Sequence, residues 1–69
     1  MNNWIIVFES KQEYKATIVQ DVLADRNFDP VIVNKKDTAY SIFGQYEVHV
    51  APVHAVRARR VVENEIKFE

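Results

Sequence analysis

Residues 31–50, VIVNKKDTAYSIFGQYEVHV, place two short apolar segments on either side of a longer polar one. Residues 31–33 are β-branched and predict a strand, and Pro30 before them is typical of an edge strand, which can spare an amide. Residues 45–50 alternate between polar and apolar side chains, which predicts a strand with one buried face and one polar face. Residues 34–44 contain the single glycine of the chain and predict a loop. The stretch therefore predicts two strands joined by an oversized hairpin.

The segment before this hairpin predicts a strand followed by a helix. Residues 4–8, WIIVF, form a short unbroken apolar run that is typical of a central strand buried on both faces. Ser10 and Glu13 have the spacing of a helix capping box. From about residue 11 to residue 26, apolar side chains recur every three or four positions, which predicts an amphipathic helix. Its apolar stripe consists of Tyr14, Ile18 and Val22, flanked by Ala16, Val19 and Leu23. Asn27 predicts the end of the helix, because asparagine tolerates the left-handed conformation.

The chain after the hairpin predicts a second, weaker helix. Pro52 suits the first turn of a helix, and small apolar side chains recur from residue 53 to about residue 64. Residues 65–69 alternate, and they predict either a short fourth strand or a frayed helix end.

The order of these elements predicts the fold class. A right-handed strand–helix–strand crossover makes the first two strands parallel and leaves room for one strand between them. The strand at residues 45–50 fills that gap, and the apolar first strand takes a central place. We therefore predict one α+β domain spanning residues 1–69, a ferredoxin-like βαββα(β) sandwich with two helices on one face of an antiparallel sheet.

The opposite face of that sheet is open, and we expect it to mediate self-association. It receives Glu47 and His49 or else Tyr46 and Val48 from the last hairpin strand, and Ile5 and Val7 or else Trp4, Ile6 and Phe8 from the first strand. Exposed apolar side chains on a sheet often mark an association surface. A chain of 69 residues without cysteine is close to the lower size limit for folding alone, so burial against another subunit would stabilise it. The alternative is that the stems of charged side chains cover the face.

Composition narrows the classes of partner. The net charge of −1 argues against nucleic acid, whose binding normally requires a basic surface. No apolar run approaches the ~20 residues that a membrane-spanning helix needs. We therefore expect a cytoplasmic protein with neither a nucleic-acid partner nor a membrane span.

The loop and the second helix hold the candidate binding residues. The loop offers polar and aromatic side chains for contact with a partner or a ligand, namely Lys35, Lys36, Asp37, Thr38 and Tyr40. The second helix carries Arg57, Arg59 and Arg60, which are suited to a phosphate or a carboxylate. The alternative for these arginines is a solvated helix face, with Arg59 and Glu63 forming a local ion pair.

The chain lacks the groupings that catalysis or metal binding requires. Glu47 and His49 share a strand face at two-residue spacing, yet a metal ion needs further ligands, and we expect a solvated or subunit-facing pair. No nucleophile–base pairing or pair of carboxylates is apparent. We therefore predict no enzyme, no cofactor and no metal site.

Several segments resemble the small bacterial domain family DUF2007. They are VFESKQEYKA at residues 7–16, VL at residues 22–23, NKKD at residues 34–37 with Tyr40, FGQYEVHV at residues 43–50, and the Ala- and Arg-rich last helix. The resemblance implies a GlnB/PII-like, ferredoxin-like βαββα(β) fold, a bacterial cytosolic setting and a signal-transducing role. It also places the loop after the second strand where PII proteins carry their effector-contacting T-loop. The loop is much shorter here and no PII nucleotide-binding motif matches, so nucleotide binding is not implied.

These observations predict a small non-enzymatic regulatory module that presents residues 34–44 to a protein partner. The alternative is a sensor of anionic or nucleotide-like metabolites, which would use the basic residues of the second helix and of the loop.

Overall fold

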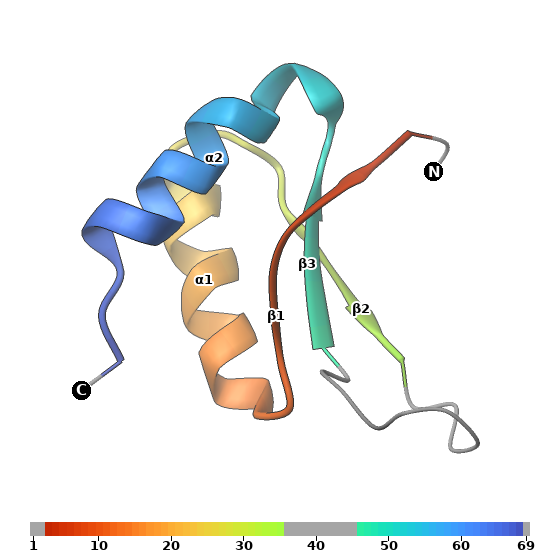
Figure 1. The fold of residues 1–69 in the computed structure, drawn as a ribbon, viewed down its shortest axis with the longest axis vertical. Helices are drawn as coiled ribbons and strands as arrows, with labels where there is room; N and C mark the ends of the chain where they lie inside the picture. Colours follow the sequence, from red (N-terminus) through yellow and green to blue (C-terminus); the bar gives the residue numbers. More distant parts are fainter. Residues whose placement is uncertain (1–2, 36–45, 69) are drawn as a thin grey trace.

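A computed structural model describes residues 3–35 and 46–68 of the chain. In this part the elements are β1 (Ile5–Ser10), α1 (Glu13–Asp25), β2 (Val31–Asn34), β3 (Tyr46–Val50) and α2 (Pro52–Glu65). The strands form an antiparallel sheet in the order β1-β3-β2 (Figure 1). Both helices contribute buried side chains to one core. This arrangement confirms the predicted α+β class and is consistent with a small ferredoxin-like fold.

The position of β1 differs from the prediction. β3 lies between the two parallel strands as expected, but β1 is an edge strand of the described sheet. Residues 66–68 form no strand, so within the described residues nothing pairs with the second edge of β1. These residues follow α2 directly, and Phe68 instead packs against the core, with its ring 5.5 Å from that of Phe8.

A bulge explains why β1 is apolar without being central. Ile6 pairs with His49 and Phe8 pairs with Val48, so Val7 is an extra residue in the ladder. The bulge lets consecutive apolar residues reach the core, since Val7 is buried and Phe8 packs against the buried cluster. Ile6, by contrast, is 40% exposed. The apolar run therefore packs mainly against the core on the helix-covered face of the sheet. The expectation that both faces of this strand are buried was wrong.

α1 begins later and is rotated relative to the prediction. Ser10 belongs to β1, and its hydroxyl accepts a hydrogen bond from the amide of Gln12 at 3.0 Å. The helix begins at Glu13 without a side-chain cap, so the predicted capping box is absent. Its buried side chains are Ala16, Val19 and Leu23, which the prediction had placed at the flank of the stripe. Tyr14 and Ile18, predicted at its centre, are exposed.

The end of α1 confirms the predicted role of Asn27. Asn27 has φ 65°, and its amide donates to the carbonyl of Ala24 at 3.0 Å. The amide of Phe28 donates to the carbonyl of Leu23 at 3.1 Å, which completes a Schellman motif. Phe28 and Leu23 are both buried, so the turn that ends the helix also contributes to the core.

The core lies between β3 and the two helices. Val48 and Val50 of β3 have no exposed surface, and neither have Val19 and Leu23 of α1. α2 contributes the smaller side chains Ala58 and Val61. Its last residue, Glu65, forms an ion pair with Arg26, which joins the C-terminal ends of the two helices.

Candidate functional site

The structure places the predicted binding residues on separate elements. Lys36, Asp37, Thr38 and Tyr40 lie outside the described residues. Lys35 is exposed and directly follows β2. Arg57, Arg59 and Arg60 are exposed on α2, which packs on β1 and β3 but makes no contact with β2. The use of Lys35 together with the arginines for one anion stays a prediction.

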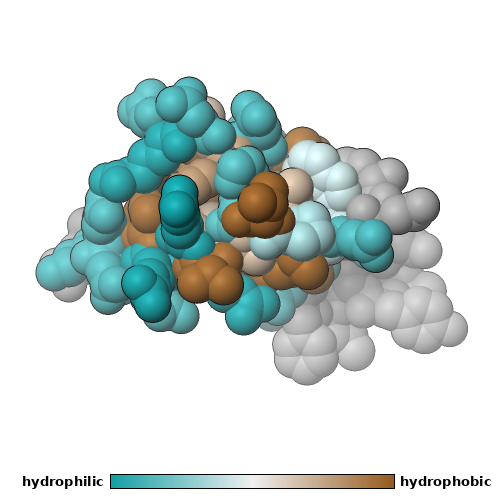
Figure 2. Space-filling view, turned by 90° about the horizontal axis from the view of Figure 1, so that it is seen from above, coloured by the Kyte–Doolittle hydropathy of each residue, from teal (hydrophilic) through white to brown (hydrophobic). Residues whose placement is uncertain are grey.

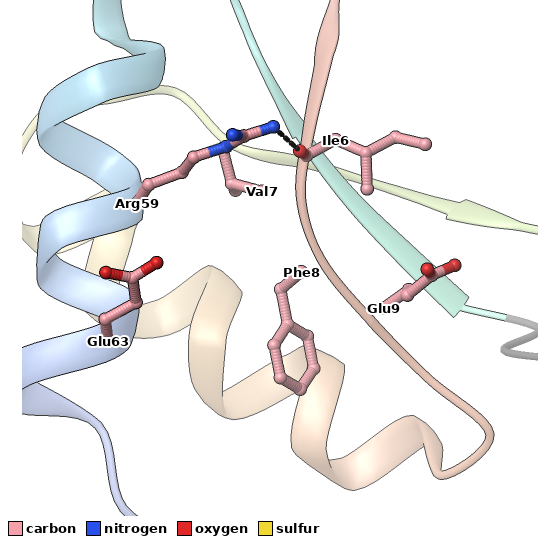
Figure 3. Close-up of a pocket in the computed structure, with 6 residues that line it drawn as sticks. All are labelled: Ile6, Val7, Phe8, Glu9, Arg59 and Glu63. Carbon is pink, nitrogen blue, oxygen red and sulfur yellow. Dashed lines mark hydrogen bonds between the residues drawn. The ribbon is translucent and has the colours of Figure 1, made fainter.

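The three arginines of α2 also differ in where they point. Arg59 reaches β1, where its guanidinium donates a hydrogen bond to the main-chain carbonyl of Ile6 at 3.3 Å (Figure 3). Arg57 and Arg60 make no ion pair or hydrogen bond with any residue of the two described segments. The ion pair between Arg59 and Glu63, which belonged to the alternative of a solvated helix face, does not form.

A groove of about 310 Å³ lies between β1 and α2. It is lined by four consecutive residues of β1 and two side chains of α2: Ile6, Val7, Phe8, Glu9, Arg59 and Glu63. Figure 3 shows Arg59 and Glu63 projecting from α2 toward β1, while Glu9 points away from both. The groove therefore combines apolar side chains of β1 with one cation and one anion from α2.

The backbone at this groove is the edge of β1 that pairs with no other strand of the described residues. β3 pairs with the other edge of β1. On the groove side, the guanidinium of Arg59 donates a hydrogen bond to the carbonyl of Ile6. An exposed strand edge presents amides and carbonyls that can pair with an extended segment of another chain. The groove also contains the apolar and charged side chains that would give such pairing specificity. We call this surface the β1 groove.

The open face of the sheet contains a closed polar pair. Nε2 of His49 lies 2.9 Å from Oε1 of Glu47, and the two side chains are 14% and 13% exposed. Ile6 and Val31 pair with His49 across the sheet, and Glu9 and Val33 pair with Glu47. The hydrogen bond satisfies the imidazole and the carboxylate within the sheet face. Of the alternatives for this strand, Glu47 and His49 are the residues on the open face.

Neither histidine is part of a metal site in the described segments. Residues 3–35 and 46–68 contain no group of three or more His, Cys, Asp or Glu side chains that could hold a metal ion. The ring of His54 instead packs against that of Phe28, with a centroid separation of 5.3 Å.

The sequence patterns did not predict the β1 groove or the hydrogen bond from Arg59 to β1. The groove depends on β1 being an edge strand and on its bulge at Val7, and both follow from contacts between distant segments. One local signal was available, because Arg59 follows the buried Ala58 and thus lies beside the packed face of α2.

The comparisons with known proteins leave the family open. No protein-family model, no curated protein and no solved structure matches the chain. The resemblance to the DUF2007 domain therefore stays a prediction. In the described segments, neither helix has the length and apolar character needed to cross a membrane.

Proposed function

We propose that this chain is a small non-enzymatic protein-binding module with a regulatory role, and that it binds an extended segment of its partner at the β1 groove. The observation that carries the proposal is the unpaired edge of β1 beside a groove with charged side chains at its rim. A partner strand would pair with the main chain of β1 and fill the space between β1 and α2. Strand addition of this kind obtains its affinity from main-chain hydrogen bonds and its specificity from side-chain pockets.

The side chains of the groove favour binding over catalysis. The six lining residues include no serine, threonine, cysteine or histidine that could act as a nucleophile or a neutral base. The charged lining residues that α2 contributes are the carboxylate of Glu63 and the guanidinium of Arg59, which suit pairing with opposite charges on a peptide. We therefore expect a partner segment that has an apolar residue facing Val7 and Phe8 and a basic residue near Glu63.

The loop at residues 34–44 remains a second contact surface in this proposal. Its first two residues, Asn34 and Lys35, are exposed at the end of β2, and residues 36–45 lie outside the described part. A partner that contacted both surfaces would extend from the edge of β1 to the far side of the sheet.

Site-specific photo-cross-linking in the native cell tests the proposal. A photoreactive residue is placed at Glu63 in the groove, at Lys35 beside the loop, and at the exposed Gln12 before α1 as a control. We expect the same partner band at position 63 in repeated captures and no such band at position 12. A band at position 35 alone would assign binding to the loop and reject the groove. Absence of a protein adduct at all three positions would contradict the protein-binding function.

A further inference from the structure

The outer surfaces of the two helices carry most of the exposed apolar side chains of the described residues. The large hydrophobic residues that are exposed in the described part of the chain are Ile6 at 40%, Tyr14 at 57%, Ile18 at 39%, Val53 at 80% and Val56 at 67%. Ile6 belongs to β1, and the other four belong to α1 and α2. Figure 2 shows apolar residues exposed among hydrophilic ones on the surface seen from above. The helices therefore hold apolar surface that the fold itself does not cover.

The exposed side of α1 is apolar and acidic. Tyr14, Ile18, Asp21 and Asp25 follow one another at spacings of four, three and four residues, which places them on one face of the helix. All four are exposed, and the buried side chains Ala16, Val19 and Leu23 occupy the opposite face. We call these four residues the α1 ridge.

The exposed side of α2 is apolar and basic. Val53, Val56, Arg57 and Arg60 follow one another at spacings of three, one and three residues, which places them on one face of the helix. All four are exposed and lie away from the buried Ala58 and Val61. We call these four residues the α2 ridge.

The two ridges are complementary in both charge and order. In each ridge the apolar pair comes first along the helix and the charged pair comes second. With a rise of ~1.5 Å per residue, the α1 ridge spans ~16 Å and the α2 ridge spans ~10 Å, so the shorter ridge fits within the longer. Parallel packing of the two would cover Tyr14 and Ile18 with Val53 and Val56. It would also bring the two aspartates beside Arg57 and Arg60.

We propose that a second copy of this chain docks on the helices, with the α1 ridge of one copy packed against the α2 ridge of the other. Both ridges point outward in one copy, so a single chain cannot satisfy them itself. The open sheet face is the weaker candidate, because its two central side chains, Glu47 and His49, are already bonded to each other. The inference does not depend on the β1 groove.

The contact joins two different surfaces, which determines the kind of assembly. Each pair of copies leaves one unused α1 ridge and one unused α2 ridge, so further copies can add to form a ring or a chain. One helix-to-helix contact is smaller than the ~1,600 Å² of a standard interface, so we expect weak association at micromolar or higher protein concentration. Its charged half makes the association weaker at high salt.

Charge reversal with rescue tests the proposal by sedimentation velocity across micromolar to millimolar concentrations. The first variant carries Asp21→Arg and Asp25→Arg, and the second carries Arg57→Asp and Arg60→Asp. We expect the unmodified chain to associate and each variant alone to lose association, because its two ridges then have the same charge. An equimolar mixture should regain association and grow with the two variants alternating, since both contacts between unlike variants then pair a basic ridge with an acidic one. A variant with all four reversals should regain the association of the unmodified chain.

The controls separate this contact from unfolding and from the sheet face. All four substituted residues are exposed, and unchanged circular dichroism and urea midpoints would show that each variant folds. Ile6→Lys alters the open sheet face and should leave association intact. A monomeric unmodified chain over the whole range would overturn the proposal. Variants that associate like the unmodified chain, or loss of association in Ile6→Lys alone, would overturn it as well.

Discussion

The two faces of β3 are stabilised in different ways, although their residues alternate along the same strand. Val48 and Val50 face the helices and have no exposed surface. Glu47 and His49 face the other way, where they hydrogen-bond to each other beside their cross-strand partners and are 13% and 14% exposed. The first face contributes stability through apolar burial, and the second through a polar pair that avoids an unsatisfied buried group.

This difference separates the residues that maintain the fold from those that are free to bind. The inward side chains of α1 and α2 complete the core with β3, so they have little freedom to change. The outward ridges of the same helices are exposed, and so are Arg59 and Glu63 at the β1 groove, so these side chains are available to partners. Substitutions in the first set should therefore lower the free energy of unfolding far more than substitutions in the second.

The largest effect is expected at the centre of the helix-covered face. Leu23→Ala removes a side chain with no exposed surface and leaves a cavity, so we expect the free energy of unfolding to fall by about 3 kcal/mol. Tyr14→Ala, on the exposed face of the same helix, should change it by less than about 1 kcal/mol. Urea denaturation measures both. Equal losses would contradict the assignment of the buried face of α1.

The end of α1 should give the next largest effect. Asn27 has φ 65°, a conformation that costs a residue with a Cβ roughly 1–2 kcal/mol unless its side chain compensates. We expect Asn27→Ala to lower the free energy of unfolding by about 1 kcal/mol, and Asn27→Gly to preserve or raise it. If the alanine variant were as stable as the glycine variant in urea, α1 would not end in the left-handed turn.

Local patterns predicted the order of elements because each depends on neighbours in the chain. The β-branched residues 31–33, the alternation of residues 45–50 and Asn27 at the helix end all correspond to elements of the structure. Right-handed crossover then placed β3 between β1 and β2.

Patterns failed where long-range packing decides the outcome. Tyr14 and Ile18 have larger side chains than Ala16, yet Ala16 is buried against the sheet, because a small side chain lets the helix approach closely. The bulge at Val7 depends on the register with β3, and the choice between a strand and no strand at residues 66–68, which the sequence left open, depends on where α2 ends. For the same reason the sequence identified the arginines of α2 but not the contact between Arg59 and β1.

The polar pair on the open face should contribute a smaller, measurable coupling. A double-mutant cycle with Glu47→Ala, His49→Ala and the double variant isolates their interaction from other effects of each substitution. We expect a coupling free energy of about 0.5–1 kcal/mol, because the side chains are largely shielded and neighbours on one strand face. Additive losses in urea denaturation would mean that the pair does not stabilise the sheet, and the contrast between the two faces of β3 would then be weaker.

The smallest effect on stability is expected at the β1 groove. Arg59→Ala removes an exposed hydrogen bond of 3.3 Å to the carbonyl of Ile6, so the free energy of unfolding should fall by about 0.5 kcal/mol or less. Arg57→Ala is the matched control, because Arg57 bonds to no residue in the described segments, and it should leave stability unchanged. Amide hydrogen exchange of β1 should nevertheless be faster in Arg59→Ala than in Arg57→Ala, since the guanidinium holds the unpaired edge of the strand against α2. Equal exchange rates in the two variants would show that Arg59 does not order this edge.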